Sequence, residues 1–254
     1  MADVEHRSPG GAQHGVNVSV VIPAFNEALR LPPTLRELSF GLNRHFDGDY
    51  EVIVSDDGST DDTSSVVTER AADDHRIRLV RSAIHLGKGY ALCAGFADSA
   101  GEAVAFLDAD LPVDVSTLAA MIARLDDADL VVGSRHMAGS SFVTPQPLGR
   151  RAGGRGFRAA VSLLGLRSVS DPQCGAKVLR RSSTETIVAA CTTDRFAFDI
   201  ELIERCRGAD LRVIEHPVAW RHVPGSSLRP ARDAVGTLFD LHALRRQFRS
   251  EKGA

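Results

Sequence analysis

Two kinds of segment take turns along the first half of the chain. Short runs of aliphatic and β-branched residues predict buried strands, and longer stretches with apolar residues three or four positions apart predict amphipathic helices. The predicted strands are Val16–Pro23, Tyr50–Ser55, Ile77–Arg81, Ala103–Leu107 and Asp129–Ser134, and the predicted helices are Arg30–Phe46, a stretch from Ser59 or Thr60 to Ala72, Gly87–Ser99 and Val115–Leu125. Strands and helices in regular turn indicate an α/β fold with a mainly parallel sheet and helices on both faces.

Beyond residue 135 the pattern is less regular. The predicted elements are a Gly-, Ser- and Pro-rich loop at Met137–Gly149, a helix at Arg150–Leu166, a short strand at Val178–Leu179, a helix at Phe198–Arg207, a late strand or pair at Leu211–Glu215 and Val218–Trp220, and a last helix at Pro230–Phe248. We expect residues 1–16 to be a disordered tail, 17–248 to form one domain, and 249–254 to be a second tail.

Acidic residues follow the predicted strands at the points where they end. The strand Ala103–Leu107 leads directly into Asp108 and Asp110, and others are followed by Glu27 and by the pair Asp56 and Asp57. Because the carboxyl ends of parallel strands lie along one edge of a sheet, we expect these acids to share a crevice. Paired carboxylates suit Mg²⁺ or Mn²⁺ shared with a phosphate, whereas the alternative at each position is an acidic cap on the next helix.

Two common phosphate-binding motifs are missing from the chain. It contains no GxxxxGK[ST] loop, and the turn after the first strand is PAFNE rather than GxGxxG. The sequence therefore predicts a site in which a metal ion, rather than a glycine loop, neutralises a diphosphate.

The composition is typical of a globular protein and does not indicate a binding partner. The 254 residues carry a net charge of −3, and the four cysteines are far apart with no CxxC pair, which favours a reduced, cytoplasmic protein. No apolar run is long enough to span a membrane, and nothing indicates a nucleic-acid partner. The charge is unevenly distributed, since Arg135–Arg181 holds nine basic residues and the single acid Asp171.

Several blocks in a fixed order resemble a known family. PAFNE, DDGSTDDT, GKG and DADLP resemble family 2 glycosyltransferases with the GT-A fold, and SDPQCGAKVLRR, FAFDIEL and HPVAWRHVPGSSL are similar to the dolichyl-phosphate and polyprenyl-phosphate branch. The similarity runs from Val18 to Arg246. It implies a donor half at about 17–135, an acceptor half at about 136–248, a UDP-sugar donor, Mg²⁺ or Mn²⁺, and a polyprenyl phosphate acceptor.

The resemblance also implies roles for residues on the donor side. The expected lining of the nucleotide-sugar pocket is Pro23, Ala24, Asn26 and Glu27 for the nucleotide, Asp56 and Asp57 for uracil and ribose, Lys88 for the diphosphate or ribose, and Gln173 and Lys177 for the sugar or diphosphate. His85 stands where relatives usually carry asparagine. Asp110 is the expected principal metal ligand, and Asp108 is shared between metal and ribose. Pro112 replaces a side-chain ligand that related mannosyltransferases place two residues after that aspartate.

The basic half supplies the expected acceptor site. The resemblance implies that Arg135 and Arg151 bind the acceptor phosphate, with Arg155 and Arg158 on the same helical face as Arg151, although a solvated basic face is the alternative for these two. Asp199, near a helix start, is expected to stay ionised and to act as a base or to orient a sugar hydroxyl. The expected catalytic residues are thus Asp110, Asp199, Arg135 and Arg151.

These expectations combine into an inverting transfer of a hexose, glucose or N-acetylhexosamine, from a UDP-sugar to a polyprenyl phosphate. Two alternatives stay open: the same fold acting on a soluble acceptor, and a non-catalytic nucleotide-sugar-binding module. A cytoplasmic location is expected, with peripheral contact at the inner face of the membrane as an open alternative. The identity of the sugar and the oligomeric state do not follow from the sequence.

Overall fold

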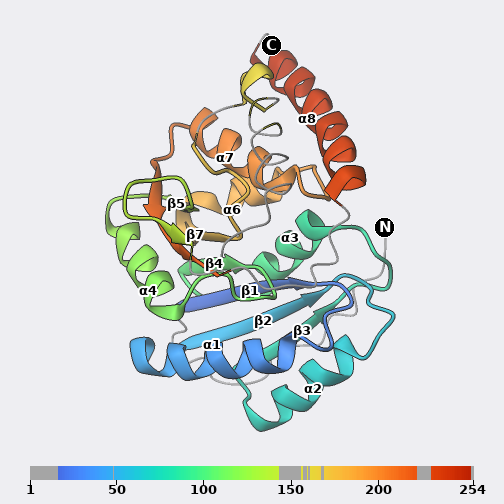
Figure 1. The fold of residues 1–254 in the computed structure, drawn as a ribbon, viewed down its shortest axis with the longest axis vertical. Helices are drawn as coiled ribbons and strands as arrows, with labels where there is room; N and C mark the ends of the chain where they lie inside the picture. The colour runs from blue at the N-terminus through green and yellow to red at the C-terminus, as the bar shows by residue number, and fades with distance from the viewer. Residues whose placement is uncertain are drawn as a thin grey trace.

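Seven strands of the described chain form one sheet at the centre of the molecule (Figure 1). The computed structural model describes residues 17–47, 49–142, 156, 159, 161–166, 169–221 and 230–252, with backbone alone at 230–235 and 252. The strands are β1 (Val18–Ala24), β2 (Tyr50–Asp56), β3 (Ile77–Arg81), β4 (Ala103–Leu107), β5 (Leu130–Ser134), β7 (Ala176–Arg180) and β8 (Val213–Pro217), in the order β3-β2-β1-β4-β7-β5-β8. The two-residue strands β6 (Ser141–Phe142) and β9 (Ala219–Trp220) pair separately.

The directions of the strands place their polar ends together. The pairs β1–β2, β1–β4, β2–β3 and β5–β8 are parallel, whereas β7 runs antiparallel to both β4 and β5. The predicted mainly parallel α/β sheet is therefore confirmed. Because β7 is reversed, it begins at the edge where its neighbours end, and the chain leading into it, including Gly175, meets the end of β4.

Strand order reverses between β1 and β4, since β2 and β3 extend the sheet on one side of β1 and later strands extend it on the other. Open α/β sheets bind ligands at such a switch point, outside the carboxyl ends of the strands. PAFNE leaves the end of β1 and DADLP leaves the end of β4, so both motifs flank this crevice.

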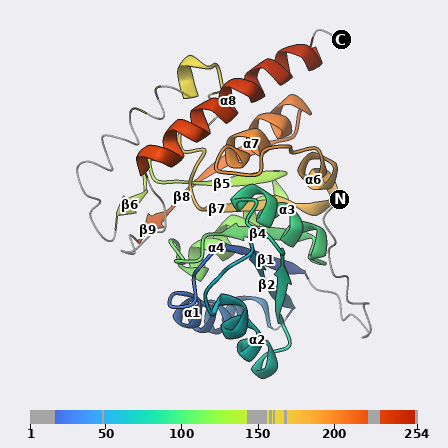
Figure 2. The same ribbon diagram turned by 90° about the vertical axis from the view of Figure 1, so that its right-hand side faces the viewer.

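Helices cover both faces of the sheet (Figure 2). The helices are α1 (Leu31–Phe46), α2 (Thr63–Asp73), α3 (Lys88–Asp98), α4 (Val115–Ala123) with the 3₁₀ turn Arg124–Asp126, α6 (Arg181–Ala189), α7 (Phe198–Gly208) and α8 (Pro230–Lys252). Apolar residues of α1, α2 and α4 pack on one face of the sheet, and those of α3, α6 and α7 pack on the other. A smaller cluster joins α7 and α8 to residues 161–166.

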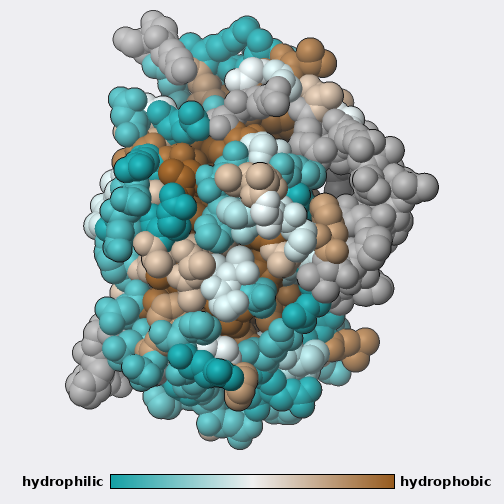
Figure 3. All heavy atoms as spheres, turned by 60° about the vertical axis from the view of Figure 1, so that its left-hand side comes forward, coloured by the Kyte–Doolittle hydropathy of each residue, from teal (hydrophilic) through white to brown (hydrophobic). Residues whose placement is uncertain are grey.

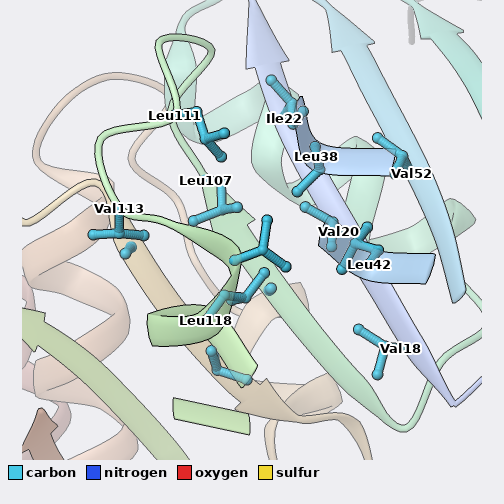
Figure 4. Close-up of a cluster of buried hydrophobic side chains, with 14 of the residues drawn as sticks. Val18, Val20, Ile22, Leu38, Leu42, Val52, Leu107, Leu111, Val113 and Leu118 are labelled. Atoms are coloured by element: carbon cyan, nitrogen blue, oxygen red, sulfur yellow. The ribbon is translucent and has the colours of Figure 1, made fainter. Parts of the chain in front are cut away.

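The turn after β4 is anchored in the core rather than left free at the surface. Leu111 and Val113 are buried beside Leu107 in the cluster under α1 and α4 (Figure 4). Leu111 has a positive φ of 45°, and the Thr34 hydroxyl donates to the carbonyl of Ala109 at 2.8 Å. Buried anchors on both sides of Asp110 fix the carboxylates between them.

Two local predictions differ from the structure. Helix α2 begins at Thr63, not at Ser59 or Thr60, because Asn26 Oδ1 accepts the backbone N–H groups of Thr60 and Asp61 and holds them in a loop. Helix α6 was not predicted: it follows β7 with no connecting loop and opens on polar residues that give no apolar period.

Two further bounds differ from the prediction. Helix α8 runs to Lys252, past the predicted end at Phe248 and into the predicted tail 249–254, and the short strand β6 lies within the predicted loop Met137–Gly149. Most of the predicted helix Arg150–Leu166 lies outside the described residues, although positions 156, 159 and 161–163 are helical. In the described part of the chain no helix is both long and apolar enough to cross a bilayer. Hydrophilic side chains make up most of the described surface in Figure 3, and hydrophobic ones show between them as separate patches.

Candidate active site

Asp108 and Asp110 form an acidic turn at the end of β4. The backbone N–H of Asp108 donates to the carbonyl of Gly175 at 3.1 Å, and the N–H of Leu111 donates to the carbonyl of Asp108 at 3.0 Å. Oδ1 of Asp110 is buried and has no hydrogen-bond partner among the described residues. Burial and the neighbouring charge of Asp108 raise the pKa of Asp110 to about 6. A buried, unpartnered carboxylate oxygen is costly unless a cation or a donor meets it.

The donor set of this turn fits a divalent cation that is shared with a substrate. Within the described ranges, no three His, Cys, Asp or Glu side chains come together as a metal-binding group, so this turn offers two carboxylates. Mg²⁺ and Mn²⁺ are commonly held by one or two carboxylates with phosphate oxygens and water. Pro112 adds no side-chain donor, and its carbonyl accepts the N–H of Arg221 at 2.9 Å.

Glu27, which follows β1, adds a third acid to the same electrostatic field. Arg30 Nη1 donates to both of its oxygens, at 2.9 and 2.8 Å. Burial raises the pKa of Glu27, Arg30 opposes that rise, and the charge of Asp110 adds to it. Glu27 and Asp110 therefore influence each other across the crevice between β1 and β4, as the convergence of strand ends predicted.

Asn26 joins the loop after β1 to the loop after β2 through hydrogen bonds. It has a positive φ of 57°, and its side-chain oxygen accepts the N–H of Thr60 at 2.9 Å and of Asp61 at 3.3 Å. Its own N–H donates to the Ser59 hydroxyl at 2.9 Å. Pro23 and Ala24 are the last two residues of β1. The amide of Asn26 thus binds PAFNE to DDGSTDDT in this structure.

Asp56 and Asp57 are both buried, and both carboxylates are bound to neighbouring backbone. Asp56 accepts the N–H of Ser59 at 2.9 Å. Asp57 accepts the N–H groups of Leu86 at 2.8 Å and Gly87 at 2.7 Å, and its Oδ2 lies 2.7 Å from Nδ1 of His85. Burial raises the pKa of Asp57, and these donors offset part of the rise. The pair therefore orders the loops around the expected base subsite.

A chain of alternating charges runs inward from the acidic turn. Lys88 Nζ lies 2.9 Å from Asp108 Oδ1 and 3.2 Å from Asp199 Oδ2, and Lys177 Nζ lies 2.7 Å from Asp199 Oδ1. The Lys177 side chain is 1% exposed, and it also donates to the carbonyl of Cys174. These four residues line one small cavity together with Gly175.

The lysines determine the ionisation of this chain of charges. Burial alone would raise the pKa of Asp199, but Lys177 and Lys88 hold it below its ordinary value. Burial lowers the pKa of Lys88, and the carboxylates of Asp108 and Asp199 more than compensate, so that it is raised. Asp199 is ionised at neutral pH, as predicted from its helix position, and a lowered pKa makes it a weak proton acceptor.

The close approach of Asp108 requires a glycine at position 175. A Cβ at this position would overlap the Asp108 carboxyl group, which could only respond by turning away. We expect Gly175→Ala to weaken Mn²⁺ binding by about ten- to a hundredfold, because small displacements of a functional group are costly. The free energy of unfolding should change by no more than about 1 kcal/mol, since the displaced atoms end a side chain.

Gly208→Ala is the matched control, because a Cβ there meets nothing within 4 Å. Calorimetric titration with Mn²⁺ and urea denaturation give the two readouts. Wild-type metal affinity in Gly175→Ala would contradict the placement of Asp108.

Arg135, at the end of β5, is held by a residue that motif reasoning did not select. Its Nε and Nη2 donate to the two oxygens of Asp171, both at 2.7 Å, and its guanidinium lies over the Trp220 ring with its carbon 4.7 Å from the centroid. Burial alone would lower the pKa of Arg135, but the hydrogen bonds and the charge of Asp171 more than offset this effect, so the pKa is raised. Asp171 therefore fixes the orientation of the Arg135 guanidinium, and Nη1 takes no part in the bidentate pair that Nε and Nη2 form with Asp171.

The remaining predicted residues divide between those near the site and those outside the described chain. Gln173 Nε2 donates to the carbonyl of Phe196 at 3.4 Å, on the approach to β7. Arg151 and Arg155 lie outside the described residues, as do Arg158 and the segment 222–229. Arg30, Asp171 and Gly175 are site residues that sequence reasoning missed. Asp171 is the single acid in a basic stretch, and both Asp171 and Gly175 lie within the block SDPQCGAKVLRR.

The fold matches solved structures of sugar transferases. The structure of glucosyl-3-phosphoglycerate synthase from Mycobacterium tuberculosis in complex with Mn²⁺ and UDP-glucose superposes with a TM-score of 0.64 at 22% identity, covering 95% of this chain and 87% of that one. Mannosyltransferase PcManGT from Pyrobaculum calidifontis, in complex with GDP-Man and Mn²⁺, gives a TM-score of 0.58 at 23% identity, covering 83% of this chain and 58% of that one. These neighbours establish the GT-A class of α/β fold.

Sequence comparison then gives the family. The family model described as glycosyl transferase family 2 matches residues 19–188, and the chain belongs to this family of glycosyltransferases. Glycosyltransferase AglD of Haloferax volcanii is 32% identical over 91% of this chain, which spans only 37% of that relative's length. A dolichyl-phosphate beta-glucosyltransferase of Dictyostelium discoideum is 30% identical, and the match covers 95% of this chain and 77% of the Dictyostelium protein.

Proposed function

We propose that this glycosyltransferase moves a hexose from a UDP-sugar onto a polyprenyl phosphate in a metal-dependent, inverting reaction. The observation that carries the proposal is the acidic turn at the β1/β4 switch point, where the buried Oδ1 of Asp110, beside Asp108, has no hydrogen-bond partner in the described part of the chain. The names of the relatives support a lipid-phosphate acceptor, and the neighbour that binds UDP-glucose with Mn²⁺ supports the donor.

Asp110 is the proposed principal ligand for Mg²⁺ or Mn²⁺, with Asp108 shared between the metal and the donor ribose. A divalent cation at these carboxylates would neutralise the charge that develops on the departing diphosphate. Lys88 forms an ion pair with Asp108, and from this position its ammonium group could donate hydrogen bonds to a diphosphate. Gln173 precedes β7 and Lys177 lies within it, where the donor sugar would lie. Glu27 adds to the negative field that attracts the cation.

The acceptor phosphate is assigned to Arg135 together with Arg151 and Arg155. Asp171 fixes the plane of the Arg135 guanidinium, which leaves its remaining N–H groups to donate to phosphate oxygens. The second pKa of such a phosphate is near 6, so most of it is already nucleophilic at pH 7 and needs no base. Asp199 then serves to hold Lys88 and Lys177, in agreement with its lowered pKa.

The donor is tested by thermal stabilisation with UDP- and GDP-sugars, each with and without Mn²⁺. Ligand binding stabilises by mass action, so UDP-glucose or UDP-N-acetylglucosamine with Mn²⁺ at a hundred times its Kd should contribute about 2.7 kcal/mol and raise Tm by several degrees. No shift with any nucleotide sugar would reject the proposed donor class.

The acceptor is tested by product analysis with the donor that binds. Polyprenyl phosphate and 3-phosphoglycerate are supplied separately with UDP-sugar and Mn²⁺, and the anomeric configuration of the product is read by NMR. Inverted product on the lipid phosphate is expected. Transfer to phosphoglycerate alone would keep the phosphate-binding role of Arg135 and replace the lipid with a soluble acceptor, and binding without transfer to either would indicate a non-catalytic module.

A further inference from the structure

We propose that His85 is a gate over the nucleobase subsite, which its imidazole ring fills in the free protein and leaves when a nucleotide binds. The proposal rests on the proposed function, because it takes Asp57 as the residue that receives the base. It goes beyond that function by naming a residue that competes with the donor.

The contacts of the imidazole ring resemble those that a pyrimidine base would make. The ring of His85 stacks on Phe25 with centroids 3.9 Å apart and an interplanar angle of 24°. Its Nδ1 lies 2.7 Å from Oδ2 of Asp57. A uracil ring also offers a flat face for stacking and an N–H for a carboxylate, so the two rings would require the same partners.

The backbone around His85 is fixed, so only the side chain is free to turn. The N–H groups of Leu86 and Gly87 are both bound to Asp57. On the other side, Gly58 has a φ of 70°, and a Cβ there would lie 2.6 Å from the carbonyl carbon of Ile84 and 2.8 Å from the nitrogen of His85. Asp57 therefore keeps its backbone donors when the imidazole leaves, and its Oδ2 regains one acceptor position.

The gate can open at small cost, because the His85 side chain is 54% exposed and turns into solvent. The closed state competes with the nucleotide. Only molecules with an open gate bind, so the apparent Kd for the nucleotide equals the intrinsic Kd divided by the open fraction. One exposed stack and one hydrogen bond favour the closed state modestly, so removing the ring should tighten UDP binding by about three- to tenfold. The effect belongs to the free protein and requires no new contact to the nucleotide.

Calorimetric titration of UDP and of GDP with Mn²⁺ tests the gate in wild type, His85→Ala and His85→Asn. His75→Ala is the control, since His75 is also exposed and lies in the turn between α2 and β3. Tighter UDP binding in both His85 variants, with the control unchanged, supports the gate; tightening of GDP in place of UDP supports it with the other base.

Unchanged or weaker binding in both His85 variants, while wild type binds UDP, overturns the gate and leaves the proposed function standing. Failure of wild type and variants to bind either nucleotide removes the gate and the proposed function together.

Discussion

Asp110→Asn should abolish sugar transfer while leaving the fold intact. The substitution keeps the shape of the side chain and removes the charge that is proposed to hold the cation, so kcat/KM should fall by about a thousandfold or more. Mn²⁺ should then no longer strengthen UDP binding. A UDP-release assay and titration of UDP with and without Mn²⁺ measure both losses.

The same variant should make the metal-free protein more stable at neutral pH. Burial raises the pKa of Asp110 from 3.8 to about 6, so the ionised side chain opposes folding by about 1–3 kcal/mol. The folded pKa is the higher one, so the penalty is absent below pH about 4, develops between pH 4 and 6, and is complete above 6. Urea denaturation in EDTA at pH 4 and pH 7.5 should show the gain only at the higher pH.

Asp114→Asn is the matched control, since this acid lies in the same loop and caps α4 by accepting the N–H of Thr117 at 2.7 Å. Asparagine caps a helix about as well as aspartate, so stability and Mn²⁺ response should stay as in wild type. Wild-type transfer by Asp110→Asn, or an undiminished Mn²⁺ effect, would exclude Asp110 as the metal ligand.

The parts of the fold that could be predicted are those in which local pattern and burial agree. The runs Val18–Ala24 and Ala103–Leu107 are apolar because both faces of a central strand are covered. Polar residues follow each run and mark where the strand ends. The start of α2 could not be predicted, because Asn26, which holds the loop open, is more than thirty positions away along the chain. Helix α6 begins at Arg181, whose guanidinium donates to the carbonyls of Gly101 and Ser99. Such long-range contacts cannot be predicted from the local sequence.

The candidate site likewise contains residues that the local sequence predicts and contacts that only the tertiary structure reveals. The acids were found from their strand ends, because a parallel sheet brings such ends together without long-range information. Two contacts that shape the site were not found. Asp171 reaches Arg135 because β7 runs antiparallel to β5, and Gly175 meets Asp108 because β7 also runs antiparallel to β4. The pairing of Lys177 with Asp199 joins the start of β7 to α7, and identifying it required the reversed strand.

Asp199→Asn should be the most destabilising substitution in the site. Lys177 is 1% exposed and would lose its counter-ion, and a buried ion pair broken on one side costs about 3–5 kcal/mol. The double variant Asp199→Leu with Lys177→Met, which replaces both charges by apolar groups, should recover much of the loss. Urea denaturation of the wild type, the single variant and the double variant gives the comparison.

The stabilising effect of Asp199 has a defined pH range. The lysines hold the folded pKa of Asp199 below its unfolded value near 3.8, so its contribution is complete above pH about 4 and is lost as the pH falls through the folded pKa. The difference between wild type and Asp199→Asn should therefore be constant from pH 5 to 8 and should shrink in stronger acid. A difference that changes between pH 6 and 8 would contradict the assigned ionisation.

Activity of the folded variant separates a positioning role from a base. If Asp199 only holds Lys88 and Lys177, Asp199→Asn lowers kcat/KM for a lipid-phosphate acceptor by about tenfold or less, and the shape of its pH profile is unchanged. A base would be recognised by a loss of a hundredfold or more and by disappearance of the acidic limb of the profile. That outcome would favour an alcohol acceptor, because a hydroxyl must give up a proton during transfer whereas a phosphate dianion has none to give. We expect the small loss, because a carboxylate held between the buried ammonium group of Lys177 and the partly buried one of Lys88 is stabilised in its charged form and resists protonation.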